Sequence, residues 1–362
     1  MRILVAGAGV SGLALALALQ KRGIAAEVVE KIPEFQTPGT AVHLPGNAVR
    51  VLELLGLEKE LQKISHPVQR QMIYDRNGQE LSSLSTSSIW STVGSSLTVS
   101  YDALRSLLQS AIDIRHIRLN TELTSASPDG RATYKDGSSE AFDLVVGADG
   151  IRPVVRENLF HVSMGTPGRV GWHFIAYDVS GDTNNQILCI GGSGRSFLIS
   201  PLSAVLTFCC AEVDSTRTPA PKSNWQNLFV DFPYKATLLL EQGENAFFTP
   251  NTGVIDTDWV RPHAVLIGDA AHPFPFGATQ GAPWPLKMHS SWRRRSCQST
   301  ARLSSLLAAY RRRRIQRVQW VVDQSKREEK FRTQPRMIRT KVSTRRTENL
   351  YKDRYSELHA MP

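Results

Sequence analysis

The sequence predicts an α/β fold into which an antiparallel β-rich unit is inserted, and three observations support this. The apolar run Ile3–Ala6 leads directly into a Gly-rich turn and an apolar helical stretch. Two later apolar runs, 144–147 and 264–267, also read as buried strands that precede a Gly/Asp pattern. Between them, residues 171–248 alternate short apolar runs with Gly, Pro, Asn and Ser, a pattern typical of an antiparallel sheet.

The first thirty residues have the order strand, Gly-rich turn, helix and strand that is typical of dinucleotide binding. Gly7 permits the tight turn, Gly9 lets a pyrophosphate approach the backbone, and Gly12 lets the helix pack closely on the strand. Glu30 follows the second strand, where a carboxylate accepts the hydroxyls of an adenosine ribose. This Rossmann-like unit alone does not decide whether the ligand is NAD or FAD. A secretory signal peptide is the competing interpretation, but a signal needs no glycines at this spacing.

Composition favours a cytoplasmic protein with a large core. Its 362 residues leave room for two domains, and its one long apolar run, the first helix, is too short to span a membrane. The four cysteines form no CxxC pair, so neither a metal site nor a disulfide framework is indicated. The net charge of +10 is positive only because of residues 283–362, which carry 21 Lys and Arg against 6 Asp and Glu. The rest of the chain has 22 Lys and Arg against 27 Asp and Glu and is therefore slightly acidic. We expect a solvated basic tail and no nucleic-acid partner, because no aromatic-interleaved binding motif accompanies it.

Further elements can be placed between these motifs. Residues 48–55 and 102–111 have helical spacing. Asn77-Gly78 and Asp136-Gly137 each lie between short strand-like segments, which predicts two β-hairpins. The remaining predicted strands, which we assign to one antiparallel sheet, are residues 187–190, 196–199 and 205–211.

Three strand-end motifs spread along the chain indicate one long ligand with several parts. The first is the Gly-rich turn, the second is Gly147-Ala148-Asp149-Gly150, and the third is Gly268-Asp269-Ala270-Ala271-His272-Pro273. Together with Arg156 and Leu44-Pro45-Gly46-Asn47-Ala48, they resemble the FAD-dependent aromatic hydroxylases. These are single-component flavoprotein monooxygenases of the para-hydroxybenzoate hydroxylase type.

The resemblance covers about residues 1–282, returns near 303–326, and implies a division of the chain. A Rossmann-like, three-layer FAD-binding domain would be assembled from three segments and an inserted substrate domain from two. The expected segments are FAD-binding residues 1–66, 101–165 and 253–282, substrate-domain residues 67–100 and 166–252, and an irregular, then helical basic C-terminal region, 283–362.

The same resemblance implies roles for particular residues. Glu30 would hold the adenosine ribose, Asp269 the ribityl hydroxyls, and Asp149-Gly150 a segment that touches both FAD and the pyridine nucleotide. Gly281 and Ala282 would place backbone N–H groups near the flavin ring. The expected FAD-binding residues are Gly7, Gly9, Gly12, Glu30, Lys31, Gly39, Ala41, Arg105, Asp149, Gly150, Asp269, Gly281 and Ala282. No metal ligand is expected.

Two positions depart from the family pattern close to the expected cofactor. The family usually has Arg at the position that Tyr101 occupies here, which alters one FAD contact, and we expect Arg105 to substitute for it. The family also usually has Ser where this chain has Pro153, a change that bears on the handling of the nicotinamide.

The chemistry that the resemblance implies is an aromatic hydroxylation. NADPH or NADH would reduce FAD, O2 would add to give a C4a-hydroperoxyflavin, and an oxygen atom would pass to an aromatic or polyketide-like small molecule. The candidate bases are His173, Tyr177 and His272, each of which also has a simpler structural role. An FAD-dependent reductase of the same fold and a non-catalytic FAD-binding remnant are the alternatives. A halogenase is disfavoured, because its Trp-x-Trp-x-Ile-Pro signature is missing.

The segment after Ala282 predicts an error of reading frame. The family continues there with a helix that begins Met-Ala-Ile-Glu-Asp-Ala, whereas Pro283–His289 contains two prolines that disfavour a helix start. If this segment is encoded by CCA TGG CCA TTG AAG ATG CAC, reading from the third base gives Met-Ala-Ile-Glu-Asp-Ala. We therefore predict that residues 283 to about 302 are out of frame. Sequencing the transcript tests this, and a clean read in the printed frame contradicts it.

Overall fold

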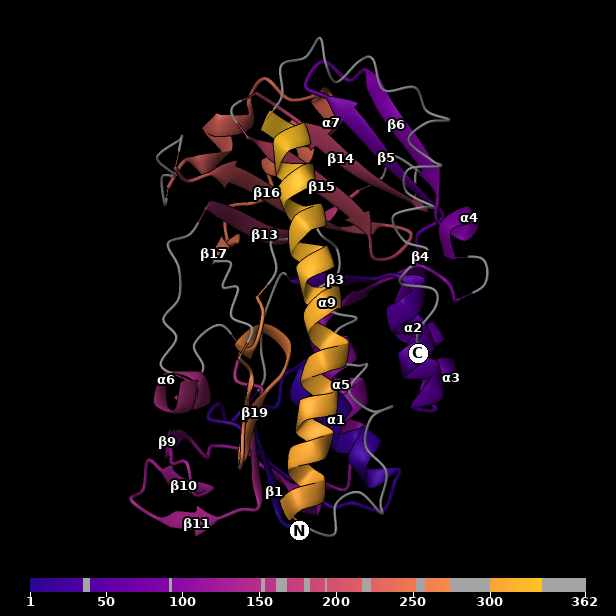
Figure 1. Cartoon of the computed structure of the whole chain (residues 1–362). Coiled ribbons are helices and arrows are strands. Elements are labelled where there is room, and N and C mark those ends of the chain that lie inside the picture. Colours follow the sequence, from indigo (N-terminus) through magenta and orange to yellow (C-terminus); the bar gives the residue numbers. More distant parts are fainter. Residues whose placement is uncertain are drawn as a thin grey trace.

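The computed structural model describes residues 1–34, 40–90, 93–150, 154–160, 168–178, 183–192, 194–216, 223–251, 258–273 and 300–333. Two main sheets lie one above the other, and the N-terminus lies at the lower end of the molecule (Figure 1). In order across the lower sheet, sheet A, the strands are β18 (Val260–Arg261), β19 (Ala264–Leu266), β12 (Leu144–Gly147), β1 (Ile3–Ala6), β2 (Glu27–Val29) and β8 (Ile117–Arg118).

The centre of sheet A is parallel and buried on both faces. β1 pairs in parallel with β12 and β2, and β12 pairs in parallel with β19. Every residue of β1, β12 and β19 is buried, as expected of parallel strands that are covered on both sides. Alternate side chains of these strands therefore point into two separate cores.

Helices and a small sheet cover the two faces of sheet A and complete a three-layer unit. The first core lies between sheet A and the helices α1 (Val10–Gln20), α2 (Gly46–Leu54), α3 (Glu58–Ile64) and α5 (Tyr101–Ser110). The second core includes residues of α4 (Thr86–Trp90), α6 (Val154–Phe160), β9 (Leu123–Ala126) and β10 (Arg131–Tyr134). The strand β11 (Ser139–Ala141) completes the three-stranded sheet D, and a 3-10 turn, η1 (Ile114–His116), precedes β8.

The upper sheet, sheet C, is antiparallel apart from one described pair. Its strands are, in order, β17 (Phe247–Asn251), β13 (Arg169–Tyr177), β16 (Leu206–Asp214), β15 (Ser196–Pro201), β14 (Asn185–Ile190), β5 (Arg70–Asp75) and β6 (Glu80–Ser85). β14 and β5 pair in parallel, although β5 precedes β14 by more than one hundred residues in the sequence. The third core lies on one face, where η2 (Trp225–Phe229) and α7 (Tyr234–Leu240) pack and the rings of Trp172 and Trp225 stack 5.0 Å apart.

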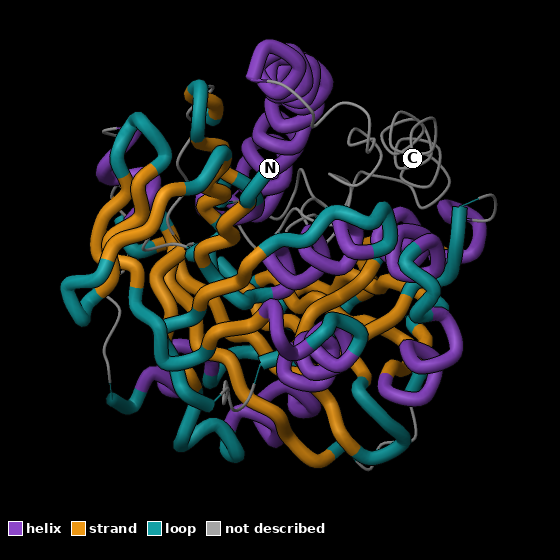
Figure 2. The backbone as a smooth tube through the Cα atoms, turned by 90° about the horizontal axis from the view of Figure 1, so that it is seen from below, coloured by secondary structure: helices purple, strands orange, loops and turns teal. Residues whose placement is uncertain are grey.

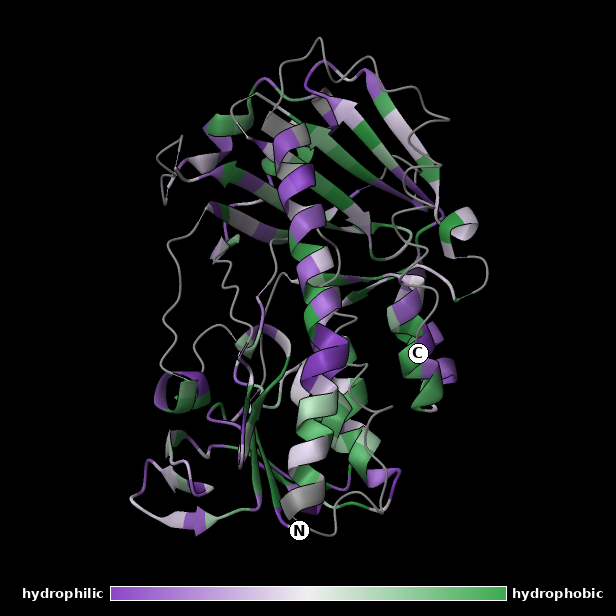
Figure 3. Cartoon of the chain, viewed as in Figure 1, coloured by the Kyte–Doolittle hydropathy of each residue, from purple (hydrophilic) through white to green (hydrophobic). Residues whose placement is uncertain are grey.

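Two more elements connect the sheets. The three-stranded sheet B consists of β3 (Ala41–Leu44), β7 (Leu97–Ser100) and β4 (Ser65–Pro67), in the order β3-β7-β4. The long helix α9 (Thr300–Thr333) rises from the level of sheet A to that of sheet C (Figure 1) and is seen nearly end-on from below (Figure 2). Its Leu307 joins the first core and its Val321 the second, whereas most of its middle and upper turns are hydrophilic (Figure 3).

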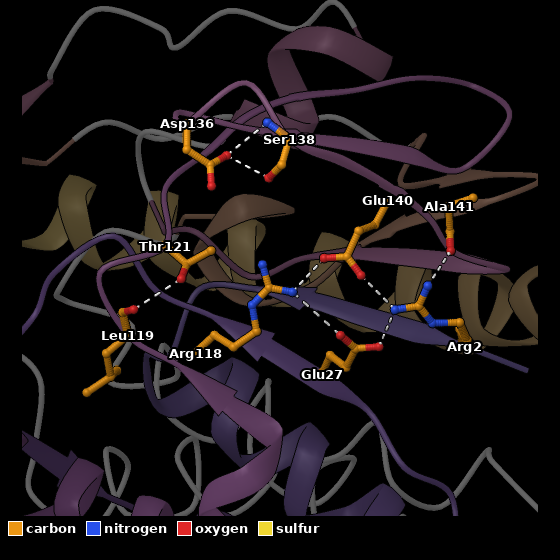
Figure 4. Close-up of polar contacts among 9 residues, drawn as sticks. All are labelled: Arg2, Glu27, Arg118, Leu119, Thr121, Asp136, Ser138, Glu140 and Ala141. Atoms are coloured by element: carbon orange, nitrogen blue, oxygen red, sulfur yellow. Dashed lines mark hydrogen bonds and ion pairs between the residues drawn. The ribbon is translucent and has the colours of Figure 1, made fainter.

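An ion-pair network fastens the lower end of sheet A to the small sheet D (Figure 4). The Arg2 guanidinium donates to Glu27 and Glu140 at 2.7 Å and 2.8 Å, and Arg118 donates to Glu140 at 2.6 Å. Because these residues come from or adjoin β1, β2, β8 and β11, the network joins strands that are distant in sequence. The hydrogen bonds that Glu140 accepts from Arg2 and Arg118 lower the pKa of its carboxyl group.

The structure confirms the predicted fold class and both hairpins. β5 and β6 flank Asn77-Gly78, and β10 and β11 flank Asp136-Gly137. In each turn the glycine has a positive φ, +80° and +84°, which explains why glycine is needed there. Within the part of the chain that the structure describes, no helix combines the length and apolar character needed to cross a membrane.

We predict that Glu140→Gln lowers the free energy of unfolding by about 1 kcal/mol or less at neutral pH, since exposed ion pairs contribute little each. Because folding lowers the pKa of Glu140, its contribution is present above the unfolded-state pKa and is lost as pH falls through the folded-state pKa. The difference between the variant and the wild type should therefore shrink in acid. Urea unfolding at several pH values measures it, with Glu60→Gln, at an exposed position of α3, as the control.

Candidate functional site

Four strand ends of sheet A bring the predicted motifs to one edge. β1, β2, β12 and β19 run parallel, so their carboxyl ends lie together. The residues that follow these ends are Gly7, Glu30, Asp149 and Asp269, respectively, within three positions of each strand. This is the edge at which open parallel sheets bind their ligands. The structure thus brings together motifs that are 260 residues apart in sequence.

The Gly-rich turn (residues 7–12), which we call the cradle, packs so tightly that a side chain at Gly7 or Gly12 would clash with the neighbouring backbone. Gly7 has φ +108°, and a Cβ there would lie 2.5 Å from the Ala148 carbonyl oxygen. A Cβ on Gly12 would lie 2.0 Å from the Gly7 carbonyl oxygen, so α1 can only approach this closely without one. A Cβ on Gly9, by contrast, would lie no closer than 3.3 Å to a described atom, the Tyr101 hydroxyl oxygen. The N-terminus of α1 therefore offers backbone N–H groups to an anion, which fits a diphosphate.

Glu30 is held beside this cradle. Its Oε2 accepts a hydrogen bond from the Ala8 N–H at 2.9 Å, and its Oε1 accepts one from the Ile32 N–H at 3.2 Å. Each carboxylate oxygen has a second lone pair, so both remain able to accept hydroxyl groups. This position fits the predicted contact with an adenosine ribose.

Asp149 and Arg156 connect the second motif to the third. Asp149 Oδ2 accepts a hydrogen bond from the Val155 N–H at 3.4 Å, and its buried Oδ1 has no hydrogen-bond partner among the described residues. Burial raises the pKa of this carboxyl to about 6. The buried Arg156 donates to the Ala270 carbonyl at 3.3 Å. The Asp149 oxygen is thus an acceptor that a ligand hydroxyl or amide can satisfy.

Asp269 lies in the short turn η3 (Gly268–Ala270) at the end of β19. Its side chain reaches solvent, yet the surrounding protein displaces enough water to raise the pKa of its carboxyl to about 6. Hydroxyl groups that donate to this carboxylate would offset the lost hydration. Asp269 therefore fits the predicted contact with a polyhydroxylated chain.

Tyr101 occupies the centre of the site, a placement that the sequence did not define. Its pKa is raised by burial and by the negative charge of Asp269, and a hydrogen bond from the Val10 N–H opposes this shift. The hydroxyl thus lies on the N-terminus of α1. One turn later, the buried Arg105 lies 6.0 Å from the Tyr101 ring and pairs with Asp102 at 3.6 Å.

The predicted bases lie in three different surroundings. His173 is buried on β13, and burial lowers its pKa to about 4. Tyr177 is 70% exposed at the end of the same strand. His272 packs edge-on against Trp259 and lies 3.4 Å from Arg314 of α9, which indicates a structural role. Among these three, His173 alone combines burial with a place in sheet C.

His173 shares the second face of sheet C with a buried polar cluster. Arg169 donates to the Ser196 hydroxyl at 3.1 Å and pairs with Glu212 at 3.6 Å. We call the face of sheet C that carries His173, Glu212 and Ser196 the inner face. It lies opposite the aromatic third core, because side chains alternate along each strand.

Some predicted positions lie outside the described residues. These are Gly39, Pro153, Gly281 and Ala282, together with residues 283–299 of the segment for which we predict a frame error. Lys31, Ala41 and Gly150 are described: Lys31 is exposed just after Glu30, Ala41 begins β3, and Gly150 has φ +71° after Asp149. Among the described residues, no group of His, Cys, Asp and Glu is arranged to hold a metal ion.

A family model gives the most general comparison. The model described as FAD binding domain matches residues 1–325. It therefore spans all three strand-end motifs and most of α9.

Two curated relatives each match more than three quarters of the chain. The chain is 29% identical over 303 residues to "Aurachin C monooxygenase/isomerase" of Stigmatella aurantiaca, which covers 78% of this chain and 76% of the relative. It is 25% identical over 321 residues to "6-hydroxynicotinate 3-monooxygenase" of Bordetella bronchiseptica, covering 78% and 79%. Klebsiella pneumoniae HpxO, solved with FAD and uric acid, has the same fold, with a TM-score of 0.81, 20% identity, and 99% and 95% of the chains covered.

We predict that Tyr101→Phe weakens FAD binding about three- to tenfold, since it removes one neutral hydrogen-bond donor from the diphosphate position. Tyr101→Arg should bind FAD at least as tightly as the wild type, because a guanidinium forms charge-assisted bonds to phosphate. Calorimetric titration of the apoprotein with FAD measures both. Tyr177→Phe, on an exposed tyrosine, is the control. Unchanged or tighter binding by Tyr101→Phe would contradict the prediction.

Proposed function

Because the chain belongs to the FAD-binding domain family of FAD-dependent aromatic hydroxylases, we propose that it uses NADPH or NADH and O2 to hydroxylate a small aromatic or heteroaromatic molecule. FAD, when bound, passes electrons from the nicotinamide to O2 and so supplies an electrophilic oxygen atom. The observation that carries the proposal is the convergence of the Gly-rich turn, Glu30, Asp149 and Asp269 on one edge of sheet A. This arrangement fits the several parts of FAD rather than a short ligand.

The residues of the chain bind and orient in this proposal. Backbone N–H groups at the start of α1 bind the diphosphate, and Tyr101 and Arg105 add a hydroxyl and a positive charge beside them. Glu30 holds the adenosine ribose and Asp269 the ribityl hydroxyls. Asp149 orients the loop after β12 through its bond to the Val155 N–H.

Sheet C supplies the substrate side. Its inner face is polar at the Arg169–Glu212 pair and apolar around Leu188 and Leu198, which face the same side in register. Such a face suits a flat ring with a few polar substituents. The relatives' printed names, a hydroxynicotinate monooxygenase and a urate hydroxylase among them, support a substrate of this class. A cytoplasmic location is part of the proposal, and the free thiols of Cys189, Cys209 and Cys210 fit a reducing compartment.

Two alternatives differ from this proposal in measurable ways. A reductase of the same fold would consume NADPH in the presence of its acceptor without O2. A non-catalytic remnant would bind FAD but would not consume NADPH when a ring is added. The residues expected at the flavin-ring end, Gly281 and Ala282, immediately precede the segment for which we predict a frame error.

We predict that the purified protein contains FAD and that hydroxylated rings accelerate its NADPH or NADH oxidation. The measurement is the absorption spectrum followed by oxidation assays with 6-hydroxynicotinate, urate, 4-hydroxyquinoline and 4-hydroxybenzoate, with and without O2. Stimulation that requires O2 and yields a hydroxylated product supports the monooxygenase. Stimulation that persists without O2 identifies the reductase, and a yellow protein that no ring stimulates identifies the remnant.

A further inference from the structure

The small sheet B has one apolar face and one polar face. Leu44, Leu97 and Val99 point into the first core, toward the helices of sheet A. Successive side chains of a strand point to opposite faces, so His43 and Thr98 lie on the other face. Their register confirms that they are neighbours, because His43 lies directly opposite Thr98 in the antiparallel pair of β3 and β7.

The polar face of sheet B contacts the inner face of sheet C. The Thr98 and Ser200 hydroxyl oxygens are 2.8 Å apart, and both residues are buried. Gln186 donates to Ser200 at 3.0 Å, and Gln71 donates to Gln186 at 2.8 Å. Gln186 is directly opposite Gln71 in the parallel pair of β14 and β5, and its hydrogen bond to Ser200 of β15 extends this polar row along one face of sheet C. His43 therefore lies on the face of sheet B that meets sheet C, opposite the face that packs into the first core.

His43 has one nitrogen engaged and one without a partner. Nε2 lies 2.7 Å from the Ser96 hydroxyl oxygen. Nδ1 is buried and has no hydrogen-bond partner among the residues that the structure describes. Burial lowers the pKa of the imidazole to about 4, so it is neutral near pH 7. A buried polar atom without a partner is unfavourable, and in a ligand site it marks a position for a ligand group.

We infer that His43 contacts the substrate, with Nδ1 accepting a hydrogen bond from a ring O–H or N–H group while Nε2–H donates to Ser96. This inference rests on the proposed function, because it places the substrate against the His43 side of sheet B. It also narrows the substrate class to aromatic or heteroaromatic rings that carry a hydrogen-bond donor. The Ser96 contact fixes the ring orientation and leaves Nδ1 directed away from Ser96.

The test compares rings with and without the donor. Calorimetric titrations of the FAD-loaded protein use 4-hydroxyquinoline, 6-hydroxynicotinate and 4-hydroxybenzoate, and the O-methyl ether of each. His43→Leu should weaken binding of the hydroxylated ring about tenfold and leave binding of its ether within about twofold, since it removes one buried hydrogen bond. His43→Asn keeps a polar atom near the Nδ1 position and should recover most of the affinity. In turnover, His43→Leu should raise KM more than it lowers kcat.

Controls separate this inference from the proposed function and from misfolding. His116→Leu changes a histidine of η1, which precedes the edge strand β8 of sheet A, and should alter neither affinity. Melting temperature and FAD content are measured for each variant. Three outcomes overturn the inference: His43→Leu lowers the affinity for a hydroxylated ring and for its ether equally, the wild type binds both equally, or no hydroxylated ring binds. Binding that depends on His43 without NADPH oxidation overturns the proposed function alone, and turnover that His43→Leu leaves unchanged overturns the inference alone.

Discussion

The candidate site depends on one close contact between backbones, where the turn after β1 passes the end of β12. A Cβ on Gly7 would come within 2.5 Å of the Ala148 carbonyl oxygen, and one on Gly12 within 2.0 Å of Gly7. Because neither residue has a Cβ, α1 starts directly above the strand ends, and its free N–H groups open onto the edge where Glu30 and Asp149 lie. The positions of the polar side chains thus follow from how tightly the backbone packs.

The sequence was sufficient wherever the determinants are local. The strand-turn-helix unit, the hairpins at Asn77-Gly78 and Asp136-Gly137, and the strand before Asp149 all depend on neighbouring residues, and all three are found as predicted. Glycine spacing also identified the cradle, since the physical demand for a missing Cβ acts at individual positions.

What the sequence could not define depends on contacts between distant segments. The parallel pairing of β14 with β5 brings Gln186 beside Gln71, and no local pattern predicts it. The place of the Tyr101 hydroxyl over α1 follows from how α5 packs on the first core. For the same reason, the sequence does not single out His43. Alternation in β3 places His43 on the face opposite Leu44, but only tertiary packing brings that face against sheet C. A histidine inside an apolar strand, two residues after an expected cofactor contact, was the available signal.

The helix α9 has a consequence for how the chain is made. Its Leu303 and Leu307 complete the core that Ile3 and Val5 begin, and its Val321 completes the other. During synthesis, β1 is made about three hundred codons before α9. Until α9 has been synthesised, the first core lacks these side chains and stays partly open to solvent. Such a chain tolerates an altered segment before α9 only if translation returns to the correct frame by Leu303. If residues 283 to about 302 are out of frame, as we predict, the packing of Leu303 and Leu307 in the first core requires the correct frame from Leu303 onward.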